Sequence, residues 1–165
     1  KPEWVDQAYS SGAAPMGGVL PAQDKPVKIA IQAMKAPHSG NLDRIQIIKV
    51  WSNGHMEYEK IFNVAVSDGR VVDSQTGSVD PLPNTVDLSK ATYTNEYGAT
   101  QLQAIWTDPS HIRGQDAAYY ARVLEIPTPR WSTYDAVKLG LPVSDKVPPT
   151  IQERAWTSPI WISGG

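Results

Sequence analysis

The sequence has 165 residues and a net charge of −2, with 41% hydrophobic and 19% charged residues and no cysteine. This composition is that of one folded globular domain and is too apolar for intrinsic disorder. The near-neutral charge excludes the basic footprint of a nucleic-acid-binding protein, and the lack of cysteine excludes disulfides, thiolate metal sites and a cysteine nucleophile.

Residues 1–25 are predicted to form a loop or linker segment before a folded β domain over 26–165. Glycine and proline are dense in this segment, for example over 14–18 (APMGG), and both residue types mark loops. A short helix over 2–9 is compatible with the sequence, because proline is tolerated in a first helical turn. The chain begins with Lys1 rather than Met, from which we expect a processed or truncated N-terminus.

The pattern typical of β-strands begins after this segment. Apolar and polar residues alternate over 27–34, which predicts a strand with one buried face. Two β-rich runs, 42–51 and 56–66, then flank Asn53-Gly54. Asn-Gly is the strongest short hairpin signal, because both central residues of a type I′ turn need positive φ. We therefore expect an antiparallel hairpin with its turn at these two residues.

The middle of the chain is predicted to be a long loop over 67–84, followed by one or two short strands over 85–94. Alternation over 100–107 predicts another strand. The run 117–126 is apolar on both faces, as in a strand at the centre of a sheet. The two prolines that follow this run are expected to end the strand.

The last part of the chain predicts a short helix over 131–141 with Ser132 or Thr133 as its cap. A helical turn or strand over 151–156 and a final strand over 160–162 follow. No helix is long enough to cross over a parallel sheet. The resulting six to eight strands predict a mainly β fold, an antiparallel two-layer sandwich with long Pro- and Gly-rich loops and little helix.

Few side chains have the spacing that catalysis or metal binding requires. His38, His55 and His111 lack the paired spacing of a metal site and are expected to be solvated loop residues. Glu57 and Glu59 share one strand face, which is typical of a solvent-facing surface rather than of a glycosidase carboxylate pair. No G-x-S-x-G motif occurs, and no run reaches the roughly 18 apolar residues of a transmembrane helix.

Tyrosine and tryptophan outnumber phenylalanine, at seven and six against one. These amphipathic rings suit either a sandwich core or an aromatic-lined binding face, and the sequence leaves both interpretations open. Over 125–133, two prolines precede Arg130 and Trp131. This segment is either a rigid corner in which Trp131 covers the core or the edge of a cleft formed with another domain.

Four stretches resemble one known family. They are 15–18 (PMGG), 40–49 (GNLDRIQIIK), 118–131 (AYYARVLEIPTPRW) and 151–161 (IQERAWTSPIW). They resemble the C-terminal part of the domain-of-unknown-function 3604 family, and the resemblance extends over nearly the whole chain. Such proteins are several times longer than this chain, are similar to PHP-type metallohydrolases and are typically exported from bacterial cells.

The resemblance implies that the chain is a C-terminal fragment of a periplasmic or secreted bacterial protein. Its implied partner is the N-terminal catalytic portion of the same parent protein. In PHP-type enzymes the His and Asp clusters that bind divalent metal belong mostly to that portion. This sequence lacks such clusters, so no metal ligand, cofactor or catalytic residue is assigned to it.

Three functions follow from these observations, and the first is preferred. It is an accessory β domain of an exported metal-dependent hydrolase, with a cleft rim formed by Met16, Gly17, Gly18, Arg130 and Trp131. The second is a stand-alone β-sandwich module that binds a sugar or peptide through exposed Trp and Tyr side chains. The third is an independent hydrolase whose site has no sequence signature. We expect the parent protein, and not this chain alone, to carry enzymatic activity.

Overall fold

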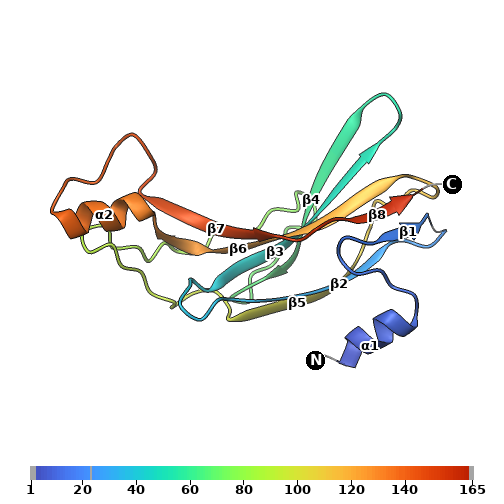
Figure 1. The fold of residues 1–165 in the computed structure, drawn as a ribbon, viewed down its shortest axis with the longest axis horizontal. Coiled ribbons are helices and arrows are strands. Elements are labelled where there is room, and N and C mark those ends of the chain that lie inside the picture. The colour runs from blue at the N-terminus through green and yellow to red at the C-terminus, as the bar shows by residue number, and fades with distance from the viewer. Residues whose placement is uncertain (1–2, 23, 164–165) are drawn as a thin grey trace.

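The computed structural model describes residues 3–22 and 24–163, and it confirms a mainly β, sandwich-like fold with little helix (Figure 1). The elements in chain order are α1 (Glu3–Ser10), β1 (Val19–Pro21), β2 (Lys28–Met34), β3 (Leu42–Ser52), β4 (Glu57–Val66), β5 (Gln101–Thr107), β6 (Ala117–Pro129), α2 (Trp131–Leu139), β7 (Thr150–Trp156) and β8 (Ile160–Ser163).

The larger sheet has six strands and is organised around β6. β3 pairs with one edge of β6, while β8 and β7 pair with the first and second halves of its other edge. β4 extends the sheet beyond β3, and β1 extends it beyond β8. The β1–β8 pair is parallel and all the other pairs are antiparallel, so the sheet is mixed. The prediction that 117–126 forms a central strand is confirmed.

The second layer is the antiparallel pair β2–β5, which lies against one face of the larger sheet (Figure 1). Both strands alternate half-buried and exposed side chains, as their sequence patterns predict. The core between the layers is formed by Ile47, Tyr119 and Ile162 of the larger sheet with Ile31 and Trp106 of the smaller one. Each such aliphatic side chain stabilises the fold by about 1.5–3 kcal/mol when fully buried.

This core also contains a buried ion pair. Lys49 and Asp108 are 1% and 2% exposed, and Lys49 Nζ lies 2.8 Å from Asp108 Oδ2. Lys49 also donates to Ser110 O at 2.8 Å, and Tyr119 Oη donates to Asp108 Oδ2 at 2.7 Å. The ammonium lies 5.1 Å from the centre of the Trp51 ring. The buried charge of Lys49 is therefore matched by a carboxylate, a carbonyl and an aromatic face.

The hairpin predicted at Asn53-Gly54 is confirmed, but its turn differs from the expected one. β3 and β4 are last paired at Ser52 and Glu57, so the loop has four residues rather than two. Within it Gly54 has a positive φ of 86°, and Asn53 does not. Asn53 Oδ1 instead accepts hydrogen bonds from the backbone N–H groups of His55 and Met56, which is the Asx turn that this side chain favours.

Strand β6 continues through Pro127 and Pro129, so the prediction that these prolines end it is wrong. Beyond Glu125 the strand pairs with β7 and no longer with β3. Arg130 N donates to Pro149 O on the β7 side. Backbone groups alternate between the two sides of a strand, so the nitrogens of both prolines point away from β7, where no ladder bond is lost.

The helix predicted over 131–141 is confirmed as α2, but neither Ser132 nor Thr133 caps it. The N-cap residue is Arg130, and no side chain caps this end. Thr133 is fully buried inside the helix and donates its hydroxyl to Pro149 O at 2.7 Å. Gly140 ends the helix with a left-handed φ of 66°.

Three further segments differ from or refine the prediction. β1 lies within 1–25, where only loop and a short helix were expected. Over 85–94 the structure has a single bridge between Asp87 and Thr92 in place of a strand. Residues 151–156 form strand β7, which decides between the two predicted alternatives.

Candidate functional site

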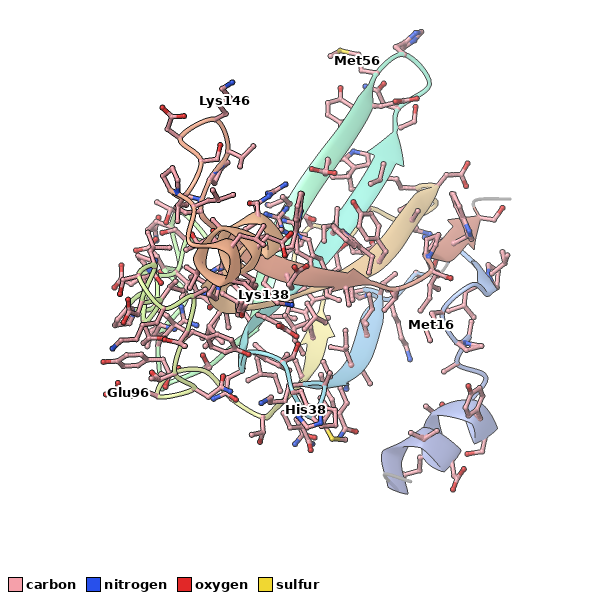
Figure 2. All side chains as sticks on the ribbon, turned by 60° about the vertical axis from the view of Figure 1, so that its left-hand side comes forward. Met16, His38, Met56, Glu96, Lys138 and Lys146 are labelled. Atoms are coloured by element: carbon pink, nitrogen blue, oxygen red, sulfur yellow. The ribbon has the colours of Figure 1, made fainter. Side chains whose placement is uncertain are left out.

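The predicted cleft rim is divided between two ends of the molecule. Gly17 N donates to Pro159 O, and Gly18 O accepts from Trp161 N, so the 16–18 loop lies beside β8. Met16 in this loop is exposed, and Figure 2 shows it far from α2, the helix that carries Lys138.

Arg130 and Trp131 lie at the opposite end of β6, where α2 begins. β8 pairs with the first three residues of this 13-residue strand. At about 3.3 Å per residue, the two halves of the predicted rim are therefore roughly 30–40 Å apart. The structure therefore does not bring Met16, Gly17 and Gly18 together with Arg130 and Trp131, and a rim shared with another domain stays a prediction.

Two depressions instead flank the end of β6 near α2. The first, which we call the acidic pocket, has a volume of about 230 Å³. Its main side chains come from the β2–β3 loop, the long loop before β5, β6, α2 and β7, and they are His38, Tyr93, Glu125, Trp131, Tyr134 and Glu153. Trp131 lines this depression and is 69% exposed, so it does not cover the core.

A close approach of the β2–β3 loop to β6 forms the floor of the acidic pocket. A Cβ on Gly40 would lie 3.1 Å from Ile126 Cγ1, so a larger residue would push the loop away from the strand. Ser39 Oγ donates to Glu125 Oε2 at 3.0 Å and orients that carboxylate. Tyr93 Oη contacts His38 O at 3.4 Å and joins the long loop to the same wall.

The electrostatics of the acidic pocket favour electropositive or hydroxyl-bearing groups. The pKa of Tyr93 is raised above its usual value, mainly by burial and further by the electrostatic effect of Tyr134 and Glu125. Glu125 and Glu153 contribute two carboxylates, and none of the described residues that line the pocket is a lysine or arginine. Carboxylates accept hydrogen bonds from hydroxyls, while the aromatic rings offer apolar faces.

The second depression, which we call the arginine groove, has a volume of about 640 Å³ and is open to solvent. Its polar and aromatic lining comes from the start of α2 and from β7 and includes Arg130, Thr150, Gln152, Glu153, Arg154 and Trp156. Glu153 lines both depressions, so the arginine groove and the acidic pocket adjoin across β7.

A buried carboxylate supports the arginine groove from below. Asp43 is 1% exposed and lies at a bulge in β3. It accepts hydrogen bonds from Arg44 at 2.8 Å and from Gln152 at 3.0 Å, and it forms a further ion pair with Arg70. Gln152 also donates to Glu125 O at 3.1 Å, which fixes β7 on β6 beneath the groove.

His38 and the pair Glu57 and Glu59 lie in different parts of the structure. His38 lines the acidic pocket, whereas His55 lies in the exposed β3–β4 loop, and Glu57 and Glu59 are exposed on β4. Within residues 3–22 and 24–163, no group of three or more His, Asp or Glu side chains is placed to hold a metal ion. Neither α1 nor α2 is long and apolar enough to cross a membrane.

The tryptophans are divided between the core and the surface. Trp106 packs in the core, at 4.8 Å from Phe62 between ring centres, and Trp51 stacks on Tyr58. Trp156 is 58% and Trp161 is 51% exposed, so with Trp131 three of these rings face solvent. Trp156 was not among the predicted site residues, although alternation over 151–156 places it on the same strand face as Arg154.

No curated protein and no solved structure matches the chain. A family model described as protein of unknown function (DUF3604) matches residues 1–164. Since this match covers nearly the whole sequence, the chain belongs to the DUF3604 family.

Proposed function

We propose that this chain is an accessory recognition domain that binds a saccharide-type ligand in the acidic pocket. The observation that carries the proposal is the convergence of three aromatic rings and two carboxylates from separate elements on one depression. Rings and carboxylates together match the two faces of a sugar, whose C–H groups pack on aromatic rings and whose hydroxyls donate to carboxylates.

The size of the acidic pocket limits its ligand to a small group. Its volume of about 230 Å³ is below the roughly 300–1,000 Å³ of pockets for drug-sized molecules. A single ring or the end of a chain suits this space better than a long polymer. Trp131 and Tyr134, both exposed on α2, are placed to cover such a ring from one side.

A titration of the 165-residue chain with neutral oligosaccharides, followed by NMR shifts, tests this proposal. Trp131→Ala is expected to weaken binding at least fivefold, because truncating an aromatic anchor costs more than about 1 kcal/mol. Trp161→Ala is the matched control, since Trp161 is similarly exposed but lies on β8. No saturable binding at millimolar ligand, or equal losses in both variants, would count against the acidic pocket.

For the parent protein we propose that the domain packs beside an N-terminal catalytic portion and delivers bound ligand to it. This part rests on the resemblance of family members to PHP-type metal-dependent hydrolases. In the full-length protein, Trp131→Ala is then expected to raise KM with little change in kcat, because ground-state binding alone is lost. An unchanged KM in a variant that has lost ligand binding would favour the alternative, a binding module that acts independently.

A further inference from the structure

The arginines of this chain are gathered on one face of the larger sheet. The strand register places Arg44 and Arg154 on either side of Leu124, and Arg122 directly opposite Trp156. Arg130 follows the end of β6 and lines the arginine groove, and Arg70 pairs with Asp43, the residue before Arg44. Of all the arginines, Arg113 alone lies elsewhere, exposed and paired with Asp24. Because the chain has a net charge of −2, this cluster is not a result of basic composition.

Few acidic groups neutralise this arginine cluster. Asp43 is shared by Arg44 and Arg70. Within the described part of the chain no ion pair is formed by Arg122, Arg130 or Arg154, and Arg122 Nε donates to the neutral Gln46 Oε1 at 2.8 Å. The exposed carboxylate of Glu153 is the one acidic group in the lining of the arginine groove.

A buried donor of the arginine groove also lacks a partner. Arg130 Nε is buried, and within the described residues it donates no hydrogen bond. Arg44 Nε is likewise buried and donates none to the described residues. Leaving a buried donor unsatisfied costs about 1–3 kcal/mol, and a bound water or ion is one way in which such a donor is satisfied. Arg130 is also the N-cap residue of the nine-residue α2, whose N-terminus has no side-chain cap. The helix dipole there adds to the attraction for an anion.

Trp156 gives the arginine groove an apolar platform beside these charges. It is 58% exposed, shares a strand face with Arg154 and lines the same depression. Arginine forks bind carboxylate and sulfate groups in two-point contacts. A tryptophan face next to them suits a sugar ring that carries such a group.

We propose that the arginine groove is a second binding site, which takes a carboxylate- or sulfate-bearing sugar residue with its oxyanion on Arg130 and Arg154 and its ring on Trp156. The saccharide part of this assignment rests on the proposed function, whereas the oxyanion part rests on the arginine cluster alone. The two adjoining depressions then bind successive residues of one acidic saccharide. The charged residue lies in the arginine groove and the neutral end lies in the acidic pocket.

Three ligands titrated onto the 165-residue chain test this proposal: cellotetraose, tetragalacturonate and a κ-carrageenan tetrasaccharide. We expect at least one of the two anionic ligands to bind tenfold or more tightly than cellotetraose, with an affinity that falls as salt is added. Binding of tetragalacturonate would indicate a carboxylate ligand, and binding of the κ-carrageenan tetrasaccharide would indicate a sulfate ligand. Equal affinities for all three ligands, or no binding of either anionic one, would overturn the oxyanion site.

Two arginine variants and a matched control locate the site. Arg154→Gln removes an exposed charge and is expected to reduce anionic binding about tenfold, and R130Q/R154Q further, with cellotetraose unaffected. Arg113→Gln makes the same change at a side chain that is 79% exposed and away from the groove, so it should have no effect. An equal loss in Arg113→Gln would refute the site. If anionic binding depends on Arg154 but not on Trp131, the groove is supported and the acidic pocket fails.

Discussion

The buried pair between Lys49 and Asp108 makes the strongest prediction about stability. Lys49→Met keeps most of the side-chain volume and removes the ammonium. Asp108 then retains its bonds from Tyr119 and Ser110 but loses the cation 2.8 Å away. Because both partners are almost completely buried, water cannot replace that cation without opening the core.

Breaking a buried ion pair from one side costs about 3–5 kcal/mol. A domain of this size has a total stability of roughly 5–15 kcal/mol, so Lys49→Met should remove about a fifth of it or more. At about 2–4 °C per kcal/mol for a chain of this length, Tm should fall by roughly 6–20 °C. Lys49→Met together with Asp108→Asn should be less destabilising than the sum of the two single changes, since neither charge is then left alone.

Urea unfolding at pH 7, followed by tryptophan fluorescence and circular dichroism, measures this cost. Lys28→Met is the matched control, because Lys28 is exposed on β2 and its replacement should change stability by less than about 0.5 kcal/mol. The reasoning fails if Lys49→Met costs under 1 kcal/mol or no more than the control. It also fails if the two changes in the double variant are simply additive.

The remaining predictions concern pH and backbone geometry. Burial alone would raise the pKa of Asp108, but hydrogen bonds from Lys49, Tyr119 and Ser110 outweigh it and hold the pKa below its usual value. The stability this carboxylate contributes is therefore present above about pH 4 and lost as pH falls through the lowered folded-state pKa, which acid titration of the unfolding free energy should show. Burial and the Asp108 bond raise the pKa of Tyr119, so stability should also fall above about pH 10, and Tyr119→Phe should reduce that alkaline loss. Gly98 has a φ of 85°, and a Cβ there would lie 2.6 Å from Asn41 Cβ, so Gly98→Ala should cost about 2–4 kcal/mol from strain and overpacking. Gly54→Ala, at a similar φ of 86° in open space, should cost about 1 kcal/mol by the same denaturation assay, and equal costs would show that the contact is unimportant.

The sequence predicts those elements whose burial follows a local period. β2 and β5 alternate every second residue, and β6 is apolar on both faces, so their positions could be read directly. The prediction that the prolines end β6 failed because a strand tolerates a proline only where its nitrogen faces no paired neighbour. That condition depends on where β3 stops pairing with β6. β1 is three residues long and gains its strand structure from β8 at the far end of the chain, a partner that no local pattern reveals.

The candidate site was predictable only in part for the same reason. Arg130 and Trp131 stood out because two prolines precede them, and both line depressions. Tyr93 and Glu153 lie 60 positions apart in the sequence, and the fold alone brings them to the acidic pocket. Alternation within β7 carried a weak signal for Arg154, since it places that residue on the same strand face as Trp156.

The parallel β1–β8 pair has a consequence for how the chain folds. It joins Val19 to Trp161, about 140 residues later, and β3 also pairs with a strand roughly 70 residues away. Such a high contact order is typical of β proteins that fold in milliseconds to seconds, because loop-closure entropy must be overcome before distant strands gain their contacts. The first half of β6 stays an open edge until β8 docks, so this edge is where partly folded molecules are most exposed to mispairing and aggregation.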